Sequence, residues 1–535
     1  LLVLVHKLLL QQLIARQQDA VGHVDRLLTP PGRLGTADVA ASSVQRLNRE
    51  QLTAVQCAAA TDRTYVWGPP GTGKTTTLGA LVAALANAGK RVLVVSPYNV
   101  AVDAAALASA RRGLAPGDIV RIGRVSEDVR RAGLDLVTQL EKNAAANGTL
   151  EAARLLLSAL GPRRGDDSPP PSTVRACLDE LGAYVVASRS SAKDPETLRV
   201  VGAIATLRQR FRTPERAILG KAQVVACTMA LYLVLDSLRA QHFDHVIVDE
   251  ASVVRPPEAV LLSLLTTAPL SFFGDPKQLP PIVISQSETA RQWLGRSPFA
   301  LAGIGKPSDA VGACVLLEEQ HRMAPPISAL VSGLFYDGRL RNGIEAPCTG
   351  HVVVVDTSRT AARATSRMVK LSTSKENQLH RAIVAEVIRA ILRADGEAGV
   401  LVISPFVAQT RAYRREPATA RLARGIRFET IHASQGSERD VVLIDLVLAG
   451  ALGKGGRSQM FDEDRNPYVA NLLNVALSRA KRRLVLVGHL AFLSGAYQGG
   501  ILDMLLRRAT DHGRIVEVPP DLLFRPALDQ EFSSS

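Results

Sequence analysis

The stretch TYVWGPPGTGKT at Thr64–Thr75 decides the fold of this chain. The apolar run TYVW is typical of a buried strand, and Leu78, Leu81, Val82 and Leu85 follow the loop at helical spacing. A strand, a glycine-rich loop and a helix in this order form a phosphate-binding loop, in which backbone N–H groups and the helix N-terminus hold phosphates. The sequence therefore predicts a nucleotide site at the carboxyl end of this strand.

The end of the loop and a second motif divide the chemistry between them. Lys74 is expected to reach the β- and γ-phosphates, and the Thr75 hydroxyl to ligate Mg²⁺. A second metal-orienting carboxylate is expected at Asp249 in HVIVDEAS, with Glu250 beside it to orient or deprotonate the attacking water. The loop residues predicted to bind the nucleotide are Gly68, Pro69, Pro70, Gly71, Thr72, Gly73, Lys74, Thr75 and Thr76.

A third polar motif, GDPKQLPP at Gly274–Pro281, also follows an apolar run. Its Gln278 is a candidate sensor that hydrogen-bonds the γ-phosphate or the attacking water and responds when the phosphate leaves. The alternative is a turn braced by prolines, with no catalytic role.

Short β-branched runs alternate with helical patterns along the whole chain, which is typical of parallel α/β sheets. One sheet is expected from Thr64–Trp67, Arg91–Ser96, Gln223–Cys227, His245–Asp249 and Leu270–Gly274, and a second from Val352–Asp356, Val400–Ser404, Asp440–Leu446 and Arg483–Gly488. These groups predict domains at 45–300 and 301–515, flanked by an N-terminal helical segment at 1–44 and a tail at 516–535. The first domain is expected to contain a largely helical insertion at 104–222 around the Pro/Gly-rich segment GPRRGDDSPPPST, Gly161–Thr173.

Length and charge agree with this organisation. A chain of 535 residues with 47% apolar and 21% charged residues can bury two or more cores. The formal net charge of +14 favours a partner with a phosphate backbone, and nucleic acid is the obvious one. The alternative is a compositional bias with the charges simply solvated.

The cysteines and the first residues bear on the cellular setting. The cysteines at 57, 177, 227, 314 and 348 are dispersed and form no CxxC pair, so neither a zinc site nor a disulfide framework is expected. This fits a reducing intracellular setting, in the cytoplasm or, in a eukaryote, the nucleus. The opening LLVLVHKLLLQQLIARQ has no basic leader region, and Lys7 interrupts its apolar run before membrane-spanning length, so we interpret it as a truncated helix and expect no membrane partner.

Taken together, the phosphate-binding loop, DEAS and GDPKQLP resemble the motifs of superfamily 1 helicases. More narrowly, the pattern from Leu47 to about Gly488 resembles the branch that contains the nonsense-mediated-decay helicase. This resemblance implies two RecA-like domains in tandem, ATP and Mg²⁺ as cofactors, and movement along a single strand of RNA or DNA in the 5′-to-3′ direction. The relatives carry a β-barrel subdomain ahead of the LNREQ segment, whereas only the helix-like stretch Leu1–Leu28 lies there in this sequence.

The resemblance assigns roles to residues of the first domain. Gln51, in LNREQ, would pair with the adenine edge. The segments SPYNVAVD and ACTMA would hold the sugar-phosphate strand through Ser96, Pro97, Tyr98, Asn99 and Thr228. The Tyr98 ring could stack on a base, but a tyrosine after a strand more often caps a core.

The resemblance also assigns residues that follow the first sheet. Arg322 in LEEQHRMAPPIS and Arg479, on a helix in NLLNVALSRAKRR, would be arginine fingers that cross from the second domain to the γ-phosphate. His321 stands where the relatives usually place a tyrosine that stacks on adenine. The segment around IHASQGSERD would link ATP to nucleic acid, with Gln435 and Gly436 near the phosphate and Glu438 toward the ribose. Thr430 and Gln435 would also contact the nucleic-acid strand.

Three functions are consistent with these motifs. The leading hypothesis is an ATP-dependent helicase or translocase on single-stranded RNA or DNA. An ATP-gated clamp that remodels nucleoprotein complexes with little unwinding would use the same motifs. A P-loop kinase or unrelated ATPase is disfavoured by Gln278, Arg322 and Arg479 together. The insertion at 104–222 is a candidate surface for protein partners, and no fused nuclease pattern is found.

Overall fold

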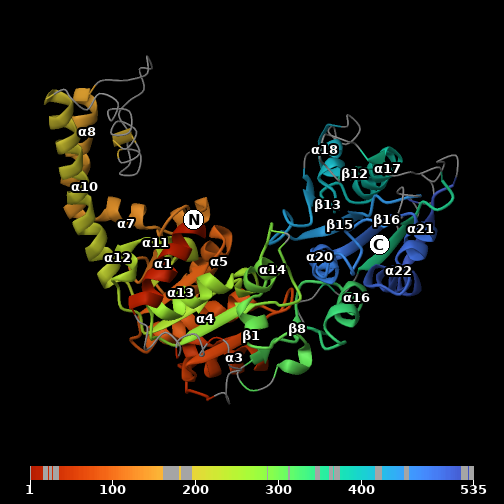
Figure 1. Cartoon of the computed structure of the whole chain (residues 1–535), viewed down its shortest axis with the longest axis horizontal. Coiled ribbons are helices and arrows are strands. Elements are labelled where there is room, and N and C mark those ends of the chain that lie inside the picture. Colours follow the sequence, from red (N-terminus) through yellow and green to blue (C-terminus); the bar gives the residue numbers. More distant parts are fainter. Residues whose placement is uncertain are drawn as a thin grey trace. The chain divides into compact units, whose positions relative to one another are not determined.

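Figure 1 shows the fold in a computed structural model of the chain. The structure describes residues 2–15, 22, 27, 35–160, 177, 180–181, 195–285, 287–310, 312, 314–343, 347, 350–360, 365–366, 374–415, 425–450, 457–519 and 528. The chain divides into two compact units. Unit 1 comprises residues 1–65, 75–251 and 256–273, and unit 2 comprises residues 66–74, 252–255 and 274–535.

The first sheet has seven strands in the order β3-β4-β2-β5-β6-β1-β7. Their bounds are β1 Arg63–Trp67, β2 Val92–Ser96, β3 Ile119–Arg121, β4 Val224–Thr228, β5 His245–Val248, β6 Leu270–Gly274 and β7 Cys314–Leu316. All five residues of β1, β2 and β6 are buried, which explains why these strands are mostly apolar and do not alternate between apolar and polar residues. The five predicted strands are confirmed to within a residue or two, whereas β3 and β7 were not anticipated.

Helices alternate with these strands in the part of the chain up to residue 301. Their bounds are α1 Leu2–Ala15, α3 Arg49–Ala60, α4 Lys74–Asn87, α5 Asn99–Ala110, α6 Glu127–Arg131, α7 Leu136–Lys142, α8 Ala144–Leu160, α10 Pro195–Lys221, α11 Met229–Val234, α12 Asp236–Arg239, α13 Pro256–Leu265, α14 Glu288–Leu294 and α15 Pro298–Leu301. Helix α4 is buried throughout Thr77–Ala86, so the helical spacing noted after the phosphate-binding loop marks a core helix. Helix α1 packs on α13 and α11, as part of unit 1.

The predicted insertion at 104–222 begins too early. Helix α5 and strand β3 lie within or across its first residues, yet α5 packs on β2, β3 and β4 and β3 joins the first sheet. The part that departs from the α/β core is α7, α8 and α10, which pack on one another, and Figure 1 shows α8 and α10 as a long helical pair. The Pro/Gly-rich segment at 161–173 lies outside the described residues.

The second sheet has six strands in the order β14-β13-β15-β16-β10-β17, and every printed pairing in it is parallel. Its strands are β10 His351–Asp356, β13 Val400–Ser404, β14 Ile426–Thr430, β15 Arg439–Asp445, β16 Ala480–Gly488 and β17 Arg514–Glu517. Two short pairs stand apart from it: β8 Glu319–Gln320 with β9 Arg341–Asn342, and β11 Thr365–Ser366 with β12 Lys375–Glu376. Its helices are α16 Pro325–Phe335, α17 Gln378–Ala394, α18 Val407–Arg415, α20 Val469–Leu477, α21 Leu490–Ala496 and α22 Ile501–His512.

Helices cover both faces of the second sheet. The apolar face of α17 packs on Val353, Val402, Leu443 and Val485, which point to one side of their strands. Helices α16, α20 and α22 pack against β10, β15 and β16, and Figure 1 shows them on the opposite side from α17. The prediction of parallel sheets flanked by helices is confirmed.

Two predicted boundaries do not match the sheets. Strand β7 at Cys314–Leu316 belongs to the first sheet, beyond the boundary predicted at residue 300. Strand β17 at Arg514–Glu517 pairs with β10, so the predicted tail from 516 begins inside a strand. Both are edge strands of three or four residues, too short to stand out in the sequence.

Candidate nucleotide and nucleic-acid sites

The phosphate-binding loop has the backbone that its glycines predict. Gly71 and Gly73 adopt φ of +77° and +75°, in the left-handed region that side chains disfavour. A Cβ on Gly68 would lie 2.9 Å from the Cβ of Lys74, and one on Gly71 would lie 2.6 Å from the Cβ of Arg322. The Thr72 hydroxyl donates to the Pro69 carbonyl (2.7 Å). The loop is therefore tightly wound, as a phosphate-binding loop requires.

The acidic pair follows β5 in unit 1. Asp249 is buried, and its N–H donates to the Val95 carbonyl of β2 (2.8 Å). Its carboxylate accepts from the Glu250 N–H (2.9 Å). Glu250 has φ of +52°, a left-handed conformation that is uncommon for a residue other than glycine and that clusters at functional sites. The turn therefore places two carboxylates with different surroundings at the end of a buried strand.

A buried carboxylate, Asp275, organises the third motif in unit 2. It accepts hydrogen bonds from the Trp67 indole (2.9 Å), the Tyr336 hydroxyl (2.6 Å), the Lys277 N–H (3.0 Å) and the Gln278 side-chain amide (2.9 Å). Burial raises the pKa of Asp275 even though these donors oppose the shift. Burial raises the pKa of Tyr336 well above its ordinary value, and the charge of Asp275 adds to this shift. Asp275 thus fixes the conformation of the motif, and the sensor role of Gln278 stays a prediction.

Gln278 and Arg479 are brought together. The Gln278 side chain donates to Asp275 and accepts from the Arg479 guanidinium (3.3 Å). Arg479 is buried and also donates to the carbonyls of Val475 (2.8 Å) and Ser437 (3.2 Å). The prediction that Arg479 lies on a helix is wrong, because α20 ends at Leu477 and Arg479 stands in the junction before β16.

Arg322 lies beside the phosphate-binding loop and is already paired. The neighbouring His321 donates its N–H to the Gly71 carbonyl (2.9 Å). The Arg322 guanidinium contacts the Glu438 carboxylate (2.8 Å) and the Ser478 carbonyl (3.3 Å). Burial alone would raise the pKa of Glu438, but Arg322 and Lys481 outweigh it and hold that pKa below the usual value. In this arrangement Glu438 binds two cations, so the ribose role predicted for it would require that pairing to open.

Two further nucleotide candidates have structural partners of their own. Gln51 is buried and closes a capping box at the start of α3, where its side chain accepts from the Asn48 N–H (3.2 Å) and Asn48 accepts from the Gln51 N–H (2.9 Å). The ring of His321 lies 3.5 Å from the Glu319 carboxylate. The adenine contacts of Gln51 and His321 stay predictions.

The nucleic-acid candidates of unit 1 differ in exposure. The Ser96 side chain is fully buried and accepts from the Tyr98 N–H (3.4 Å), so it is poorly placed to hold a strand. Tyr98 is 40% exposed and does not cap a core, which leaves its ring accessible. Asn99 accepts from Arg121 (2.9 Å), and Thr228 caps α11. Pro97 follows the end of β2, between Ser96 and Tyr98.

In unit 2 the candidates lie around the carboxyl end of β14. Thr430 is the last residue of that strand, and its hydroxyl accepts from the Ala433 N–H (3.4 Å). Gly436 has φ of +81°, which explains the need for glycine there. Among the residues that the structure describes, the amide nitrogen of Gln435 is a buried donor for which no protein acceptor lies within reach. A ligand acceptor would satisfy it, which fits the predicted role of Gln435.

Sequence reasoning missed Asp275, Trp67, Tyr336 and Asn474. The Asn474 side chain donates to the Lys277 carbonyl (2.8 Å) and to the Tyr336 hydroxyl (2.7 Å), so it completes the Asp275 cluster. Asp275 carried a visible signal, because it follows a buried strand as Asp249 does. Tyr336 and Asn474 are far from the motif in sequence, and only the tertiary fold brings them to it.

Several features are not found in the described part of the chain. It contains no cluster of three or more His, Cys, Asp or Glu side chains that could hold a metal ion. Among the helices described, none has the length and apolar character needed to cross a membrane. Cys57, Cys177, Cys227 and Cys314 are buried, and position 348 lies outside the described residues.

Comparison with known proteins finds two matching domain families and several similar proteins. Two families, each described as an AAA domain, match residues 46–286 and 307–491. The chain is 28% identical over 519 residues to the regulator of nonsense transcripts 1 homolog of Arabidopsis thaliana, covering 92% of this chain and 36% of that protein. It is 25% identical to the ATP-dependent helicase upf1 of Schizosaccharomyces pombe, covering 85% of this chain and 46% of the relative. It is also 27% identical to the DNA-binding protein SMUBP-2 of Rattus norvegicus, covering 84% and 43%.

The chain thus spans less than half the length of these curated relatives. A solved arterivirus helicase in complex with DNA is 15% identical with a TM-score of 0.36, covering 84% of this chain and 64% of the viral one, and it adds nothing to the assignment. The two domain matches and the relatives agree with the order of the motifs along the sequence. Together they support a superfamily 1 helicase of the nonsense-mediated-decay type.

Proposed function

We propose that this chain is an ATP-dependent helicase or translocase that moves along single-stranded RNA or DNA, from 5′ to 3′. The observation that carries the proposal is that the Gln278 side chain is hydrogen-bonded to both the Asp275 carboxylate and the Arg479 guanidinium. A glutamine held at both ends of its amide is pre-organised to detect a γ-phosphate. Arg479 is pre-organised beside it to stabilise charge on the transferring phosphoryl group.

The chain's own residues divide the work of hydrolysis. Lys74 and the amides of its loop bind the phosphates, and Glu250 orients or deprotonates the attacking water. Thr75 and Asp249 offer the hydroxyl and carboxylate oxygens that Mg²⁺ prefers, and the bound ion would supply charge neutralisation on the phosphates. Arginine fingers are typically worth about 10³–10⁵ in rate, so Arg479 and Arg322 are expected to dominate the gain from charge stabilisation.

A contact in unit 2 supports coupling between hydrolysis and motion. Asn471 donates to the carbonyls of Pro276 (3.1 Å) and Gln278 (2.5 Å), and Asn474 to that of Lys277 (2.8 Å). Both asparagines lie on α20, which leads directly to Arg479 and β16. A rearrangement of the Gln278 loop when phosphate leaves would therefore shift α20 and the loop contacts together.

The test is steady-state ATP hydrolysis without nucleic acid and with single-stranded RNA, single-stranded DNA or duplex. Stimulation by a single strand is expected, together with displacement of a labelled strand from a duplex that has a 5′ overhang but not from one with a 3′ overhang. Lys74→Ala and Glu250→Gln should abolish stimulated hydrolysis with an unchanged circular dichroism spectrum, whereas Lys221→Ala, an exposed lysine at the end of α10, should have no effect.

The outcomes separate the alternatives. Stimulated hydrolysis without strand displacement would favour the ATP-gated clamp. Equal turnover with and without nucleic acid would contradict the proposal and favour an unrelated ATPase. The proposal includes an intracellular location, in the cytoplasm or the nucleus, which localisation experiments test. It also includes a partner-binding role for the α8 and α10 pair, which pull-down experiments test.

A further inference from the structure

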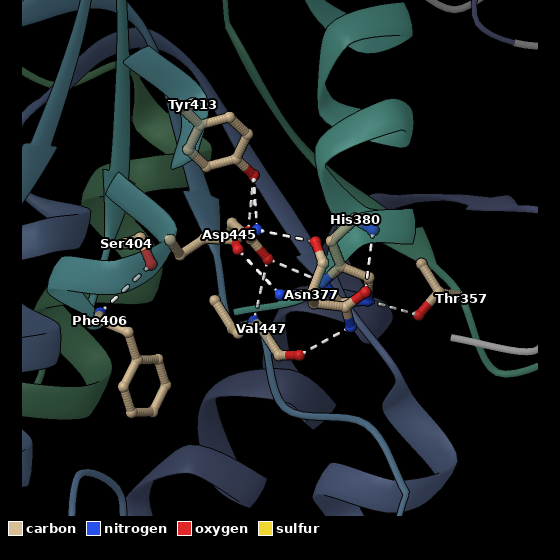
Figure 2. Close-up of polar contacts among 9 residues, drawn as sticks. Thr357, Asn377, His380, Ser404, Phe406, Tyr413, Asp445 and Val447 are labelled. Atoms are coloured by element: carbon tan, nitrogen blue, oxygen red, sulfur yellow. Dashed lines mark hydrogen bonds and ion pairs between the residues drawn. The ribbon is translucent and has the colours of Figure 1, made fainter. Parts of the chain in front are cut away.

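The second sheet buries a charged hub at the end of its central strands (Figure 2). Asp445, the last residue of β15, is fully buried. One carboxylate oxygen lies 2.8 Å from His380 Nδ1 and accepts from the Val447 N–H (2.9 Å). The other accepts from the Gln409 amide (2.7 Å) and the Tyr413 hydroxyl (2.6 Å). Burial alone would raise the pKa of Asp445, but the charge of His380 and these hydrogen bonds lower it.

The hub holds a strained turn. Val447 has φ of +65°, a backbone conformation that β-branched residues rarely adopt, and the Leu448 N–H bonds back to the Leu446 carbonyl (2.6 Å). Asp445 accepts from the Val447 N–H, and the Asn377 side chain donates to the Val447 carbonyl (2.9 Å). The N–H and the carbonyl of the strained residue are therefore both hydrogen-bonded to buried side chains. Such strain persists only where the surroundings over-determine it, and it is concentrated at functional sites.

The hub also braces the neighbouring strand ends. In the sheet order β14-β13-β15, Ser404 pairs with Thr430, and Ile403 pairs with Ile444 beside Asp445. The Tyr413 ring stacks on Phe428 with centroids 5.3 Å apart. Tyr413 thus connects Asp445 to the strand whose last residue, Thr430, is a predicted nucleic-acid contact. The carboxylate at the end of β15 therefore reaches β14 through Tyr413, and β13 lies between these two strands in the sheet.

Exposed arginines lie on the helix that packs on β13 and β14. Arg411, Arg414 and Arg415 are exposed on α18, the helix that also carries Gln409 and Tyr413. A core that served packing alone would gain as much from apolar side chains, because a buried charge that must be fully hydrogen-bonded seldom adds net stability. The more specific advantage of a buried, fully hydrogen-bonded carboxylate is that it holds the surrounding side chains in a single geometry.

We propose that Asp445 is a positioning residue that sets the strength with which the second domain grips a single strand. It acts through the Val447 turn, α18 and the Tyr413–Phe428 stack, which together hold the edge carrying Thr430 and the α18 arginines. The inference rests on the proposed function and assigns a role to residues outside the phosphate-binding loop, DEAS and GDPKQLPP.

The test measures ATP hydrolysis by the full chain as a function of single-strand concentration, with the strand that stimulates the wild-type protein best. Asp445→Asn keeps the size of the side chain but removes its charge and places a donor opposite donors. The concentration for half-maximal stimulation should rise about tenfold, comparable to the loss of one charge-assisted hydrogen bond, while kcat at saturation stays within about twofold. Tyr413→Phe keeps the ring on Phe428 and should give a smaller rise in the same direction.

A matched control is Asp503→Asn on α22, another buried aspartate in unit 2, which pairs with Arg507 (3.0 Å). It should lower the thermal midpoint without changing the half-maximal concentration. An unshifted half-maximal concentration in Asp445→Asn, or an equal shift in Asp503→Asn, would overturn the inference. If Asp445→Asn does not fold, an unshifted Tyr413→Phe overturns it instead. A wild-type protein that no single strand stimulates would remove the proposed function itself.

Discussion

At the scale of single residues, two glycines of similar conformation distinguish the effect of backbone strain from that of close packing against an added side chain. Gly71 has φ of +77°, and an added Cβ would lie 2.6 Å from the Cβ of Arg322. Gly89, after α4, has φ of +76° but nothing within 4 Å of an added Cβ. An alanine at either site incurs the left-handed penalty of about 1–2 kcal/mol, but only at Gly71 must the neighbouring backbone also move.

Gly71→Ala is therefore expected to weaken ATP binding about tenfold or more, because the displaced segment carries both the loop and Arg322. Gly89→Ala should lower the thermal midpoint slightly and bind ATP normally. Titration with a fluorescent ATP analogue measures both. Equal loss of affinity in the two variants would show that strain alone, and not the contact with Arg322, sets the need for glycine at position 71.

At the scale of the strand, β5 contains a buried histidine that makes the first sheet sensitive to acid. His245 is fully buried and bonds Ser271 of β6 (2.8 Å) through Nε2. Burial lowers the pKa of His245 to about 4. The unfolded chain takes up a proton below about pH 6.5, whereas the folded chain does so only below about pH 4, so acid favours the unfolded state between these values.

The thermal midpoint is expected to fall as the pH is lowered from about 7 to about 5, with a loss of at most about 1.4 kcal/mol per pH unit from this residue. His245→Asn, which cannot take up the proton, should flatten that dependence. His512→Asn, at an exposed histidine that ends α22, should leave it unchanged. An identical pH dependence in wild type and His245→Asn would assign the acid sensitivity to other groups.

At the scale of the whole molecule, the net charge of +14 should govern binding to a single strand. Counterion release makes such affinity depend steeply on salt. With about five phosphate contacts on a single strand, affinity should fall on the order of a hundredfold between about 50 and about 200 mM salt. Fluorescence anisotropy of a labelled single strand gives the slope. A slope near zero would show that the charge is solvated surface rather than a phosphate-binding face.

Much of the fold was predictable because its signals are local. A parallel strand buried on both faces must be apolar along its length, and a phosphate-binding loop requires glycine at 71 and 73, so both features appear in a single stretch of sequence. Nine strands and the core helix α4 were found in this way. The edge strands β3, β7, β14 and β17 were not. Strands β3, β7 and β17 have too few residues to show a pattern, and β14 alternates apolar and polar residues instead of forming an apolar run.

The sequence by itself determined the order of the motifs, the class of ligand they suit and the presence of two sheets, because each depends on residues close together in the chain. Only the tertiary structure decided which distant side chains meet. Arg479 donates to Gln278, and Tyr336 donates to Asp275. Asp445 contacts His380, Gln409 and Tyr413. Buried polar groups must be satisfied, but the sequence does not say by which partner. That choice depends on the register and packing of the strands that carry them.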